Sequence, residues 1–343
     1  MRALYEAYDG ALCDLDGVCY LGSEPIPYAA ESIAATQQAG LRYVFLTNNA
    51  SRTHIDIAEQ LAGFGIQVDP HQIYGSADAA LRLAADMLPG GASILLVGGD
   101  GLREAASSYD FRYVTSADDH PMAVIHGWYP EVDWAALSEV ALAIRAGARY
   151  IATNVDPTIP RERGGMIGQG SLVAAVENST GVNALSGGKP AAGIFEQAAQ
   201  RGKLARPVVI GDGLSTDLAG AHHAGYDSIH VLTGVTQARD ICLADAETRP
   251  SYVLRDLRGL LQPYPQVRVG VSDGISRASV GAWSAQVSER EVVVSSDEGA
   301  ALTLDVDPLP VDAYRALAYA WWNAADRGIA VHASMLPELR VED

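Results

Sequence analysis

The sequence predicts an α/β protein whose core is a doubly wound parallel sheet. Two observations lead to this prediction. Short apolar runs alternate with amphipathic segments of helical period, which favours parallel strands joined by crossover helices. Polar residues also follow several apolar runs, at the points where strands would end. With 343 residues, the chain is long enough for two or three domains, each with its own core.

The alternation is clearest over residues 1–78, which we assign to a core domain. Pro25 and Pro27 stand just before the first helical pattern and favour a helix start there. The elements expected in this segment are strands at 11–14 and 42–47 and helices at 28–38 and 54–63.

Residues 79–185 repeat the α/β pattern without the polar motifs of the first segment, so we predict a separate domain inserted into the core. The core then resumes over residues 186–262. Such an insertion is tolerated because the two ends of a domain often lie close together. The insertion is expected to contain strands 93–97, 122–126 and 149–153 and helix 134–145. The resumed core is expected to contain helices 192–201 and 216–224 and strands 207–211 and 228–232.

Residues 264–343 differ from both domains and predict a small α+β extension at the C-terminus. Tyr314, Leu317 and Trp321 fall on one apolar face of a helix expected at 311–327. The strands expected in the extension are 266–271, 278–287, 291–296 and 329–333.

The composition is acidic, with 42 Asp and Glu against 24 Lys and Arg and a formal net charge of −18. This charge argues against a nucleic-acid partner, because phosphate backbones require a basic surface. No apolar run approaches the ~20 residues that span a bilayer, so we expect no membrane insertion. The three cysteines follow no disulfide or zinc spacing, which favours a cytoplasmic protein. The sequence leaves open whether the chain forms a homo-oligomer.

Two aspartates follow the first expected strand. Asp14 and Asp16 are two residues apart, so in extended backbone they point to the same side. They would lie at the carboxyl edge of the sheet, where open α/β sheets bind ligands. Neighbouring carboxylates raise each other's pKa unless a cation lies between them, which favours a divalent metal site with one carboxylate free for chemistry. The plain alternative is a strand followed by an acidic turn.

Three later segments also place polar groups at strand ends: Thr47-Asn48, Gly187-Gly188-Lys189-Pro190, and Asp212 followed by Asp217. Each has a plain alternative, namely a helix cap, a solvated lysine and a turn aspartate. With the aspartate pair, however, the three segments resemble in order and type the four motifs of the haloacid dehalogenase (HAD) superfamily of phosphatases.

The resemblance implies hydrolysis of a small-molecule phosphate ester through an aspartyl-phosphate. It implies that Asp14 is the nucleophile and that Asp16 is the general acid and then the general base. It also implies a Mg²⁺ cofactor bound by Asp14, by the backbone carbonyl of Asp16 and by Asp212, since hard oxygen ligands suit Mg²⁺. Asp217 would support the metal or orient the motif lysine, or else have only a helix N-terminal role.

The remaining motif residues are implied to bind the phosphoryl group. The Thr47 hydroxyl and the Asn48 backbone N–H would hold its oxygens, and Lys189 would neutralise its charge.

The inserted domain resembles the C2 cap of HAD phosphatases, and residues 151–157 and 164–171 resemble the NagD-like branch, class IIA. The resemblance spans about residues 8–262. It implies that the cap loop containing Asn154, Asp156 and Ile159 faces the core site. Where the pyridoxal-phosphate branch carries a histidine, this chain has Ile159, which resembles the branch acting on phosphoglycolate and glycerol phosphate.

The C-terminal extension resembles the fused segment of mycobacterial glycerol-3-phosphate phosphatases, which looks like a fragment of a GNAT acetyltransferase. The Gly-rich loop that holds acetyl-CoA is not visible, so we interpret the extension as structural or as an interaction surface. Cap and extension together favour glycerol 3-phosphate as substrate. Phosphoglycolate or another small sugar or metabolite phosphate is the alternative. A non-catalytic regulatory or binding protein on a HAD scaffold is a second alternative, and the intact motif residues count against it.

Overall fold

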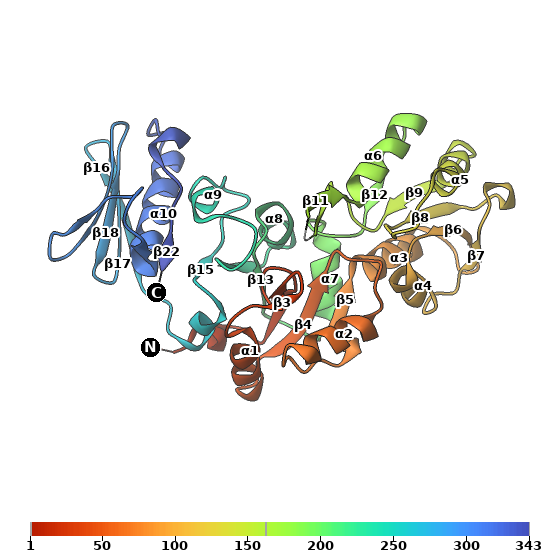
Figure 1. Cartoon of the computed structure of the whole chain (residues 1–343), viewed down its shortest axis with the longest axis horizontal. Coiled ribbons are helices and arrows are strands. Elements are labelled where there is room, and N and C mark those ends of the chain that lie inside the picture. Colours follow the sequence, from red (N-terminus) through yellow and green to blue (C-terminus); the bar gives the residue numbers. More distant parts are fainter. Residues whose placement is uncertain (1, 162, 343) are drawn as a thin grey trace. The chain divides into compact units, whose positions relative to one another are not determined.

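The computed structural model, drawn in Figure 1, describes residues 2–161 and 163–342. By their internal contacts these residues form two compact units. The first unit contains the described residues up to Ala11, Ile26–Leu41 and the chain from Arg206 onward; the second contains Leu12–Pro25 and Arg42–Ala205. Strand β1 (Gly10–Asp14) begins in the first unit and ends in the second. Residues 1 and 343, the outer limits of the predicted core and extension, and residue 162 of the predicted cap lie outside the described residues.

In the second unit, the parallel strands β4 (Arg42–Thr47) and β5 (Ile73–Gly75) carry the loops that follow them to one sheet edge, because Thr47 lies opposite Gly75. Helix α2 begins at a capping box in which the Thr53 hydroxyl accepts from the Asp56 N–H at 3.1 Å. The other elements here are the hairpin of β2 (Tyr20–Leu21) and β3 (Glu24–Pro25), α2 (His54–Gly63), η2 (Pro70–Gln72) and α7 (Ala192–Arg201).

The second unit also contains a separate five-stranded sheet of order β12-β9-β8-β6-β7, in which neighbouring strands are parallel. Its strands are β6 (Ser93–Val97), β7 (Arg112–Val114), β8 (Ala123–His126), β9 (Arg149–Ala152) and β12 (Leu185–Ser186). Its helices are α3 (Ser76–Met87), α4 (Asp100–Ala106), η3 (Ala117–Asp119), α5 (Trp134–Arg145) and α6 (Gln169–Thr180). A hairpin of β10 (Thr158–Arg161) and β11 (Gly164–Ile167) follows β9.

Helices cover both faces of this cap sheet, as Figure 1 shows, because its strands are apolar on both sides. In β9, Tyr150 and Ala152 pack with residues of α5 and α6, whereas Ile151 packs with residues of α3 and α4. The alternation follows the two-residue period of a strand.

The first unit contains three parallel strands, β13 (Pro207–Gly211), β14 (Asp227–Val231) and β15 (Tyr252–Leu254). Between β13 and β14 the chain forms a π-helical turn, η4 (Leu214–Leu218), that continues into α8 (Ala219–Ala224). Its further helices are η1 (Leu4–Ala7), α1 (Ala29–Gln38), α9 (Ala238–Cys242) and η5 (Leu257–Leu261).

The C-terminal extension belongs to the first unit. It has an antiparallel sheet with α10 packed along one face (Figure 1). On β17, Ser276, Ala278 and Val280 are buried in alternation with partly exposed neighbours. The strands are β16 (Val267–Ser272), β17 (Ile275–Val280), β18 (Trp283–Val287), β19 (Val292–Ser296) and β20 (Ala301–Leu302). The remaining elements are β21 (Leu309–Pro310), α10 (Val311–Asp326), η6 (Ala333–Met335) and β22 (Val341–Glu342).

The α/β class is confirmed, but three predicted elements need correction. Residues 278–287, predicted as one strand, are split between β17 and β18 by a turn at Gly281, whose φ of 58° favours glycine. Residues 329–333, predicted as a strand, are not one. The helix predicted at 216–224 begins earlier, as the π-helical turn η4. Within the described residues, none of the helices combines the length and apolarity that a membrane span requires.

Candidate active site

Asp14 and Lys189 form a buried ion pair in the second unit. Asp14 is the last residue of β1, and the Lys189 ammonium donates to its carboxylate Oδ1. The two residues are only 8 % and 3 % exposed. A charge this well buried requires a partner of opposite sign, so each side chain holds the other in its ionised form.

The two glycines before Lys189 lie too close to neighbouring atoms for a side chain to fit. A Cβ on Gly188 would lie 2.7 Å from the Asn48 Oδ1 and 2.7 Å from the Thr153 carbonyl, and one on Gly187 would lie 2.5 Å from the Ala80 nitrogen. Small residues therefore let the lysine loop reach Asp14 between β4 and the cap.

The chain turns directly after β1, and this turn exposes Asp16. Gly17 has a φ of 85°, and its N–H donates to the Tyr20 carbonyl at 2.6 Å. Burial raises the pKa of Tyr20, and the negative charges of Asp16 and Asp14 raise it further. The Tyr20 phenol is thus held neutral near both carboxylates.

Two thiols that sequence reasoning set aside hold the backbone of Asp14. The Sγ atoms of Cys13 and Cys19 donate to its carbonyl oxygen at 3.3 and 3.6 Å. A hydrogen bond with Cys19 and burial raise the pKa of Cys13, so this side chain remains a thiol able to donate. The six-residue spacing of the two cysteines matches no familiar motif, so the sequence held no signal for this contact.

The loop after β4 presents the Thr47 hydroxyl. Thr47 is 7 % exposed, and its Oγ1 accepts from the Asn49 N–H at 3.0 Å. Because this bond occupies a lone pair, the hydroxyl proton remains for a further acceptor such as a phosphoryl oxygen. Asn49 is itself fixed, since its Oδ1 accepts from the Ser51 N–H at 2.9 Å.

The predicted cap residues divide into two groups. Asn154 and Asp156 hydrogen-bond to Asn48, the residue after Thr47. Ile159 is half-buried in β10 opposite Met166, and its predicted effect on substrate choice remains a prediction.

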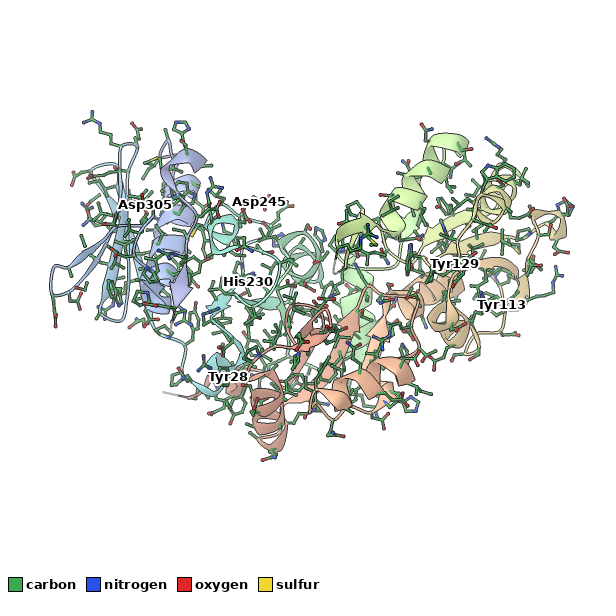
Figure 2. The ribbon with its side chains drawn as sticks, in the orientation of Figure 1. Tyr28, Tyr113, Tyr129, His230, Asp245 and Asp305 are labelled. Atoms are coloured by element: carbon green, nitrogen blue, oxygen red, sulfur yellow. The ribbon has the colours of Figure 1, made fainter. Side chains whose placement is uncertain are left out.

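In the first unit, Asp212 follows β13 directly and is 4 % exposed. Its Oδ2 accepts from the Val235 N–H at 2.6 Å, and a Cβ on Gly234 would collide with this carboxylate. The buried His230 ring on β14, labelled in Figure 2, contacts the Asp212 carbonyl at 3.1 Å through Nε2. Burial lowers the pKa of His230 to about 4. The imidazole that contacts the Asp212 backbone carbonyl is therefore neutral.

Asp217 stabilises the turn that follows Asp212. Its Oδ2 accepts from the Gly213 N–H at 3.2 Å and from the Thr216 hydroxyl at 3.3 Å. These bonds match the helix N-terminal role that the sequence left open for this residue. Its metal-supporting role remains a prediction.

Two stretches of the chain match known hydrolase families. Residues 11–112 match the haloacid dehalogenase-like hydrolase family, and residues 186–260 match the related HAD-hydrolase-like family. A D-glycerol 3-phosphate phosphatase of Mycobacterium tuberculosis is 37 % identical over 329 residues, which cover 94 % of this chain and 88 % of that protein. The chain belongs to the haloacid dehalogenase-like hydrolases.

Solved structures of this hydrolase family agree. The glycerol phosphate phosphatase of M. tuberculosis, in complex with magnesium, has a TM-score of 0.80 at 34 % identity and covers 100 % of this chain and 95 % of its own. A thermostable NPPase variant from Geobacillus stearothermophilus has a TM-score of 0.67 at 33 % identity, over 75 % of this chain and 98 % of its own. The 5'-nucleotidase YutF of Bacillus subtilis is 33 % identical over 74 % of this chain and 97 % of its own.

For a HAD-like hydrolase, the second unit offers a specific chemical arrangement. A buried carboxylate is kept ionised by an adjacent lysine, and a threonine hydroxyl is oriented with its proton available. A nucleophilic carboxylate and nearby donors are the groups that phosphoryl transfer needs. The first unit offers a second buried carboxylate, Asp212, whose side chain and backbone carbonyl both have hydrogen-bond partners.

Proposed function

We propose that this hydrolase is a Mg²⁺-dependent phosphatase that acts on glycerol 3-phosphate through an aspartyl-phosphate. The observation that carries the substrate assignment is coverage. The mycobacterial glycerol 3-phosphate phosphatase matches 94 % of this chain, whereas the 5'-nucleotidase matches 74 %. The similarity to the mycobacterial enzyme extends beyond the phosphatase core to nearly the whole chain, and this supports a shared substrate.

Asp14 is proposed to attack the phosphorus atom, since the Lys189 ammonium keeps its carboxylate ionised. Asp16 is proposed to protonate the leaving alkoxide and later to take a proton from the water that releases phosphate. Its exposure supports this role, because a proton-transfer group must reach both the ester oxygen and water. Lys189, the Thr47 hydroxyl and the Asn48 N–H are proposed to bind the phosphoryl oxygens.

The donor chemistry fits a magnesium ion. The second unit offers the Asp14 carboxylate and the first unit offers the carboxylates of Asp212 and Asp217. Mg²⁺ prefers such oxygen ligands, and the mycobacterial phosphatase was solved with magnesium and with calcium. We propose Asp14, the Asp16 carbonyl and Asp212 as ligands, with Asp217 in support. When bound, the ion would neutralise charge on the phosphoryl group.

A second candidate substrate class is other small phosphate esters. Acid sugar phosphatases of staphylococci, including one of Staphylococcus epidermidis at 34 % identity over 74 % of this chain, favour this class. Phosphoglycolate and sugar phosphates belong to it.

A panel of esters tests the proposal. We expect kcat/KM for glycerol 3-phosphate to exceed that for phosphoglycolate, glucose 6-phosphate, a 5'-nucleotide and p-nitrophenyl phosphate. Activity should disappear with EDTA and return with Mg²⁺. A higher kcat/KM for a sugar phosphate or nucleotide would move the assignment to that substrate. Turnover unaffected by EDTA would refute the proposed requirement for a metal.

We further propose a cytoplasmic location. The three cysteines Cys13, Cys19 and Cys242 are free and buried, in keeping with a reducing compartment. Cell fractionation tests this location. The sequence left open whether the chain associates with a second copy, and light scattering on the purified protein tests this.

A further inference from the structure

The cap loop after β9 is joined to the loop after β4 by hydrogen bonds that converge on Asn48. The Asn48 side-chain nitrogen donates to the Asp156 Oδ2 at 2.9 Å. The Asn48 backbone carbonyl accepts from the Asn154 Nδ2 at 2.7 Å and from the Ser76 hydroxyl at 2.7 Å. The Asn154 Oδ1 in turn accepts from the Asp156 N–H at 3.2 Å, so the two cap residues fix each other.

Asn48 is bonded to the lysine loop as well. Its Oδ1 accepts from the Lys189 N–H at 2.9 Å, and its Nδ2 donates to the Lys189 carbonyl at 3.3 Å. One side-chain amide therefore pairs with both backbone polar groups of Lys189. Because the ammonium of Lys189 is paired with Asp14, the cap loop is connected to the proposed nucleophile through only two intervening residues.

The hydrogen-bonding capacity of Asn48 is well used by these contacts. The two protons of the side-chain amide nitrogen are matched by two acceptors, the Asp156 carboxylate and the Lys189 carbonyl. The two lone pairs of the backbone carbonyl are matched by two donors, from Asn154 and Ser76. The bond to Asp156 is to a carboxylate, which makes it stronger than one between neutral groups. Asn154 is only 7 % exposed, so its amide is held by its surroundings. The backbone carbonyl of Asn48 is consequently held by Asn154 of the cap together with Ser76.

We propose that Asp156 and Asn154 are positioning residues for phosphate binding: they fix Asn48 and, through it, Lys189. The inference rests on the proposed function, in which the Asn48 N–H and Lys189 bind the phosphoryl group. It differs from the expectation that this loop selects substrates by touching their leaving groups. Loss of a positioning residue weakens binding of the phosphoryl group itself, so it affects every ester alike.

Inorganic phosphate is the probe that separates the two roles, because it has no leaving group. In Asp156→Ala, we expect the inhibition constant of phosphate to rise about tenfold, the effect of losing one hydrogen bond to a charged group. We expect kcat/KM for glycerol 3-phosphate, phosphoglycolate and p-nitrophenyl phosphate to fall by one common factor. Asp156→Asn keeps an oxygen acceptor for Asn48 and should recover most of both losses.

Ser171→Ala is the matched control. The Ser171 hydroxyl donates to the Pro157 carbonyl at 2.8 Å, within the same cap segment but away from Asn48. Its phosphate inhibition and turnover should stay within about twofold of wild type, since only a neutral exposed hydrogen bond is lost. A double-mutant cycle adds a second readout: Asp156→Ala should cost little more once Asn48→Ala is present.

The inference is overturned if Asp156→Ala leaves phosphate inhibition unchanged, if its loss is confined to one ester, or if Ser171→Ala loses as much. If Asp156→Ala does not fold, Asp156→Ser takes its place in the same comparison. A wild-type protein that hydrolyses none of the esters would instead refute the proposed function.

Discussion

At the scale of single residues, Asp14 combines two demands that normally conflict. It must be buried to work in a water-poor site, and it must be ionised to attack phosphorus. The ion pair with Lys189 reconciles them, because a buried positive charge stabilises the carboxylate. The Cys13 and Cys19 thiols donate to the backbone carbonyl of Asp14. The backbone and the side chain of this residue are therefore both held by hydrogen bonds.

Replacing Asp14 by Asn is therefore expected to remove activity while the fold remains, because an amide fills the same volume but cannot form an acyl phosphate. Phosphate release should fall by at least about a thousandfold. The assay is colorimetric phosphate release alongside circular dichroism. Asp86→Asn is the control, because Asp86 pairs with exposed Arg82 at 2.8 Å on the surface of α3; this variant should keep wild-type turnover. Turnover of Asp14→Asn close to wild type would remove Asp14 from its role.

Asp16→Asn tests the proton-transfer role separately from the nucleophile. An alkoxide leaves poorly without a proton, whereas a nitrophenolate leaves without help. We expect kcat for glycerol 3-phosphate to fall at least about tenfold more than kcat for p-nitrophenyl phosphate. Steady-state kinetics on both esters gives the comparison. Equal losses on the two would argue against a general acid at residue 16.

At the scale of elements, loops are set by close contacts that only small residues permit. Gly188 lies where the lysine loop, the Asn48 amide and the cap strand end come together within the second unit. The contact requires the absence of a Cβ, and the backbone of Thr153 cannot yield as a flexible side chain would.

Gly188→Ala should therefore displace the lysine loop and lower kcat/KM by about tenfold or more, with a smaller effect on the thermal midpoint. Gly63→Ala, at the end of α2, is the matched control because nothing lies within 4 Å of the added methyl group. It should be neutral or slightly stabilising, since Ala favours helix over Gly. Kinetics and differential scanning fluorimetry of both variants provide the check. An unimpaired Gly188→Ala would show that the loop has room to move.

The cap sheet contains a buried histidine that makes its stability depend on pH. His126 contacts the Tyr150 hydroxyl at 3.0 Å, and burial lowers the pKa of His126 to about 4. The folded protein keeps this ring neutral, whereas the unfolded chain protonates it below about 6.5. The unfolded state therefore binds more protons between these values, and stability is lost as the pH falls from about 6.5 toward 4.

Between pH 7 and pH 5 this one ring should lower the free energy of unfolding by about 2 kcal/mol. His126→Gln removes the titrating group, so its loss of stability over the same interval should be smaller by about that amount. Thermal unfolding of both proteins at the two pH values gives the difference. Identical pH dependence of variant and wild type would mean that His126 does not titrate as its burial requires.

At the scale of the whole molecule, the C-terminal extension shares a core with the rest of the first unit. Within that unit, the Tyr314 hydroxyl donates to the Ala238 carbonyl at 2.8 Å, and the Trp322 indole N–H donates to the Ile241 carbonyl at 3.0 Å. The Arg315 guanidinium donates to the Val253 carbonyl at 2.9 Å. One face of α10 thus covers the extension's sheet while side chains of the same helix bond to α9 and β15.

Truncation after residue 263 should therefore lower the thermal stability of the protein more than its phosphatase activity. The cut exposes apolar residues of α9 and β15, so we expect the thermal midpoint to fall by at least about 10 °C. Below that temperature the remaining protein should still release phosphate, since the proposed catalytic residues precede the cut. Fluorimetry and the phosphate assay measure the two effects. A stable, folded truncation with no activity would give the extension a direct role in the reaction.

The sequence predicted what short patterns encode. Strand ends followed by Asp14, Thr47, Lys189 and Asp212 could be located from apolar runs and motif order, and the structure places each at the end of a strand or in the loop that follows. The Asn48–Asp156 bond joins residues 108 positions apart, and no local pattern reports such a pairing. The contact between α10 and α9 could not be predicted for the same reason, since the apolar face of a helix does not identify the element that it packs against.

In the proposed reaction, Asp14, supported by Lys189 and Thr47, receives the phosphoryl group beside a bound Mg²⁺. A crystal structure of the protein with Mg²⁺ and beryllium fluoride tests this claim most directly, because beryllium fluoride mimics an aspartyl-phosphate. We expect the beryllium to be bonded to an Asp14 carboxylate oxygen, its fluorides to contact Lys189 and Thr47, and the Mg²⁺ to be bound by Asp14 and Asp212. A beryllium adduct on another residue would refute Asp14 as the nucleophile, and a metal bound without Asp212 would refute the proposed magnesium site.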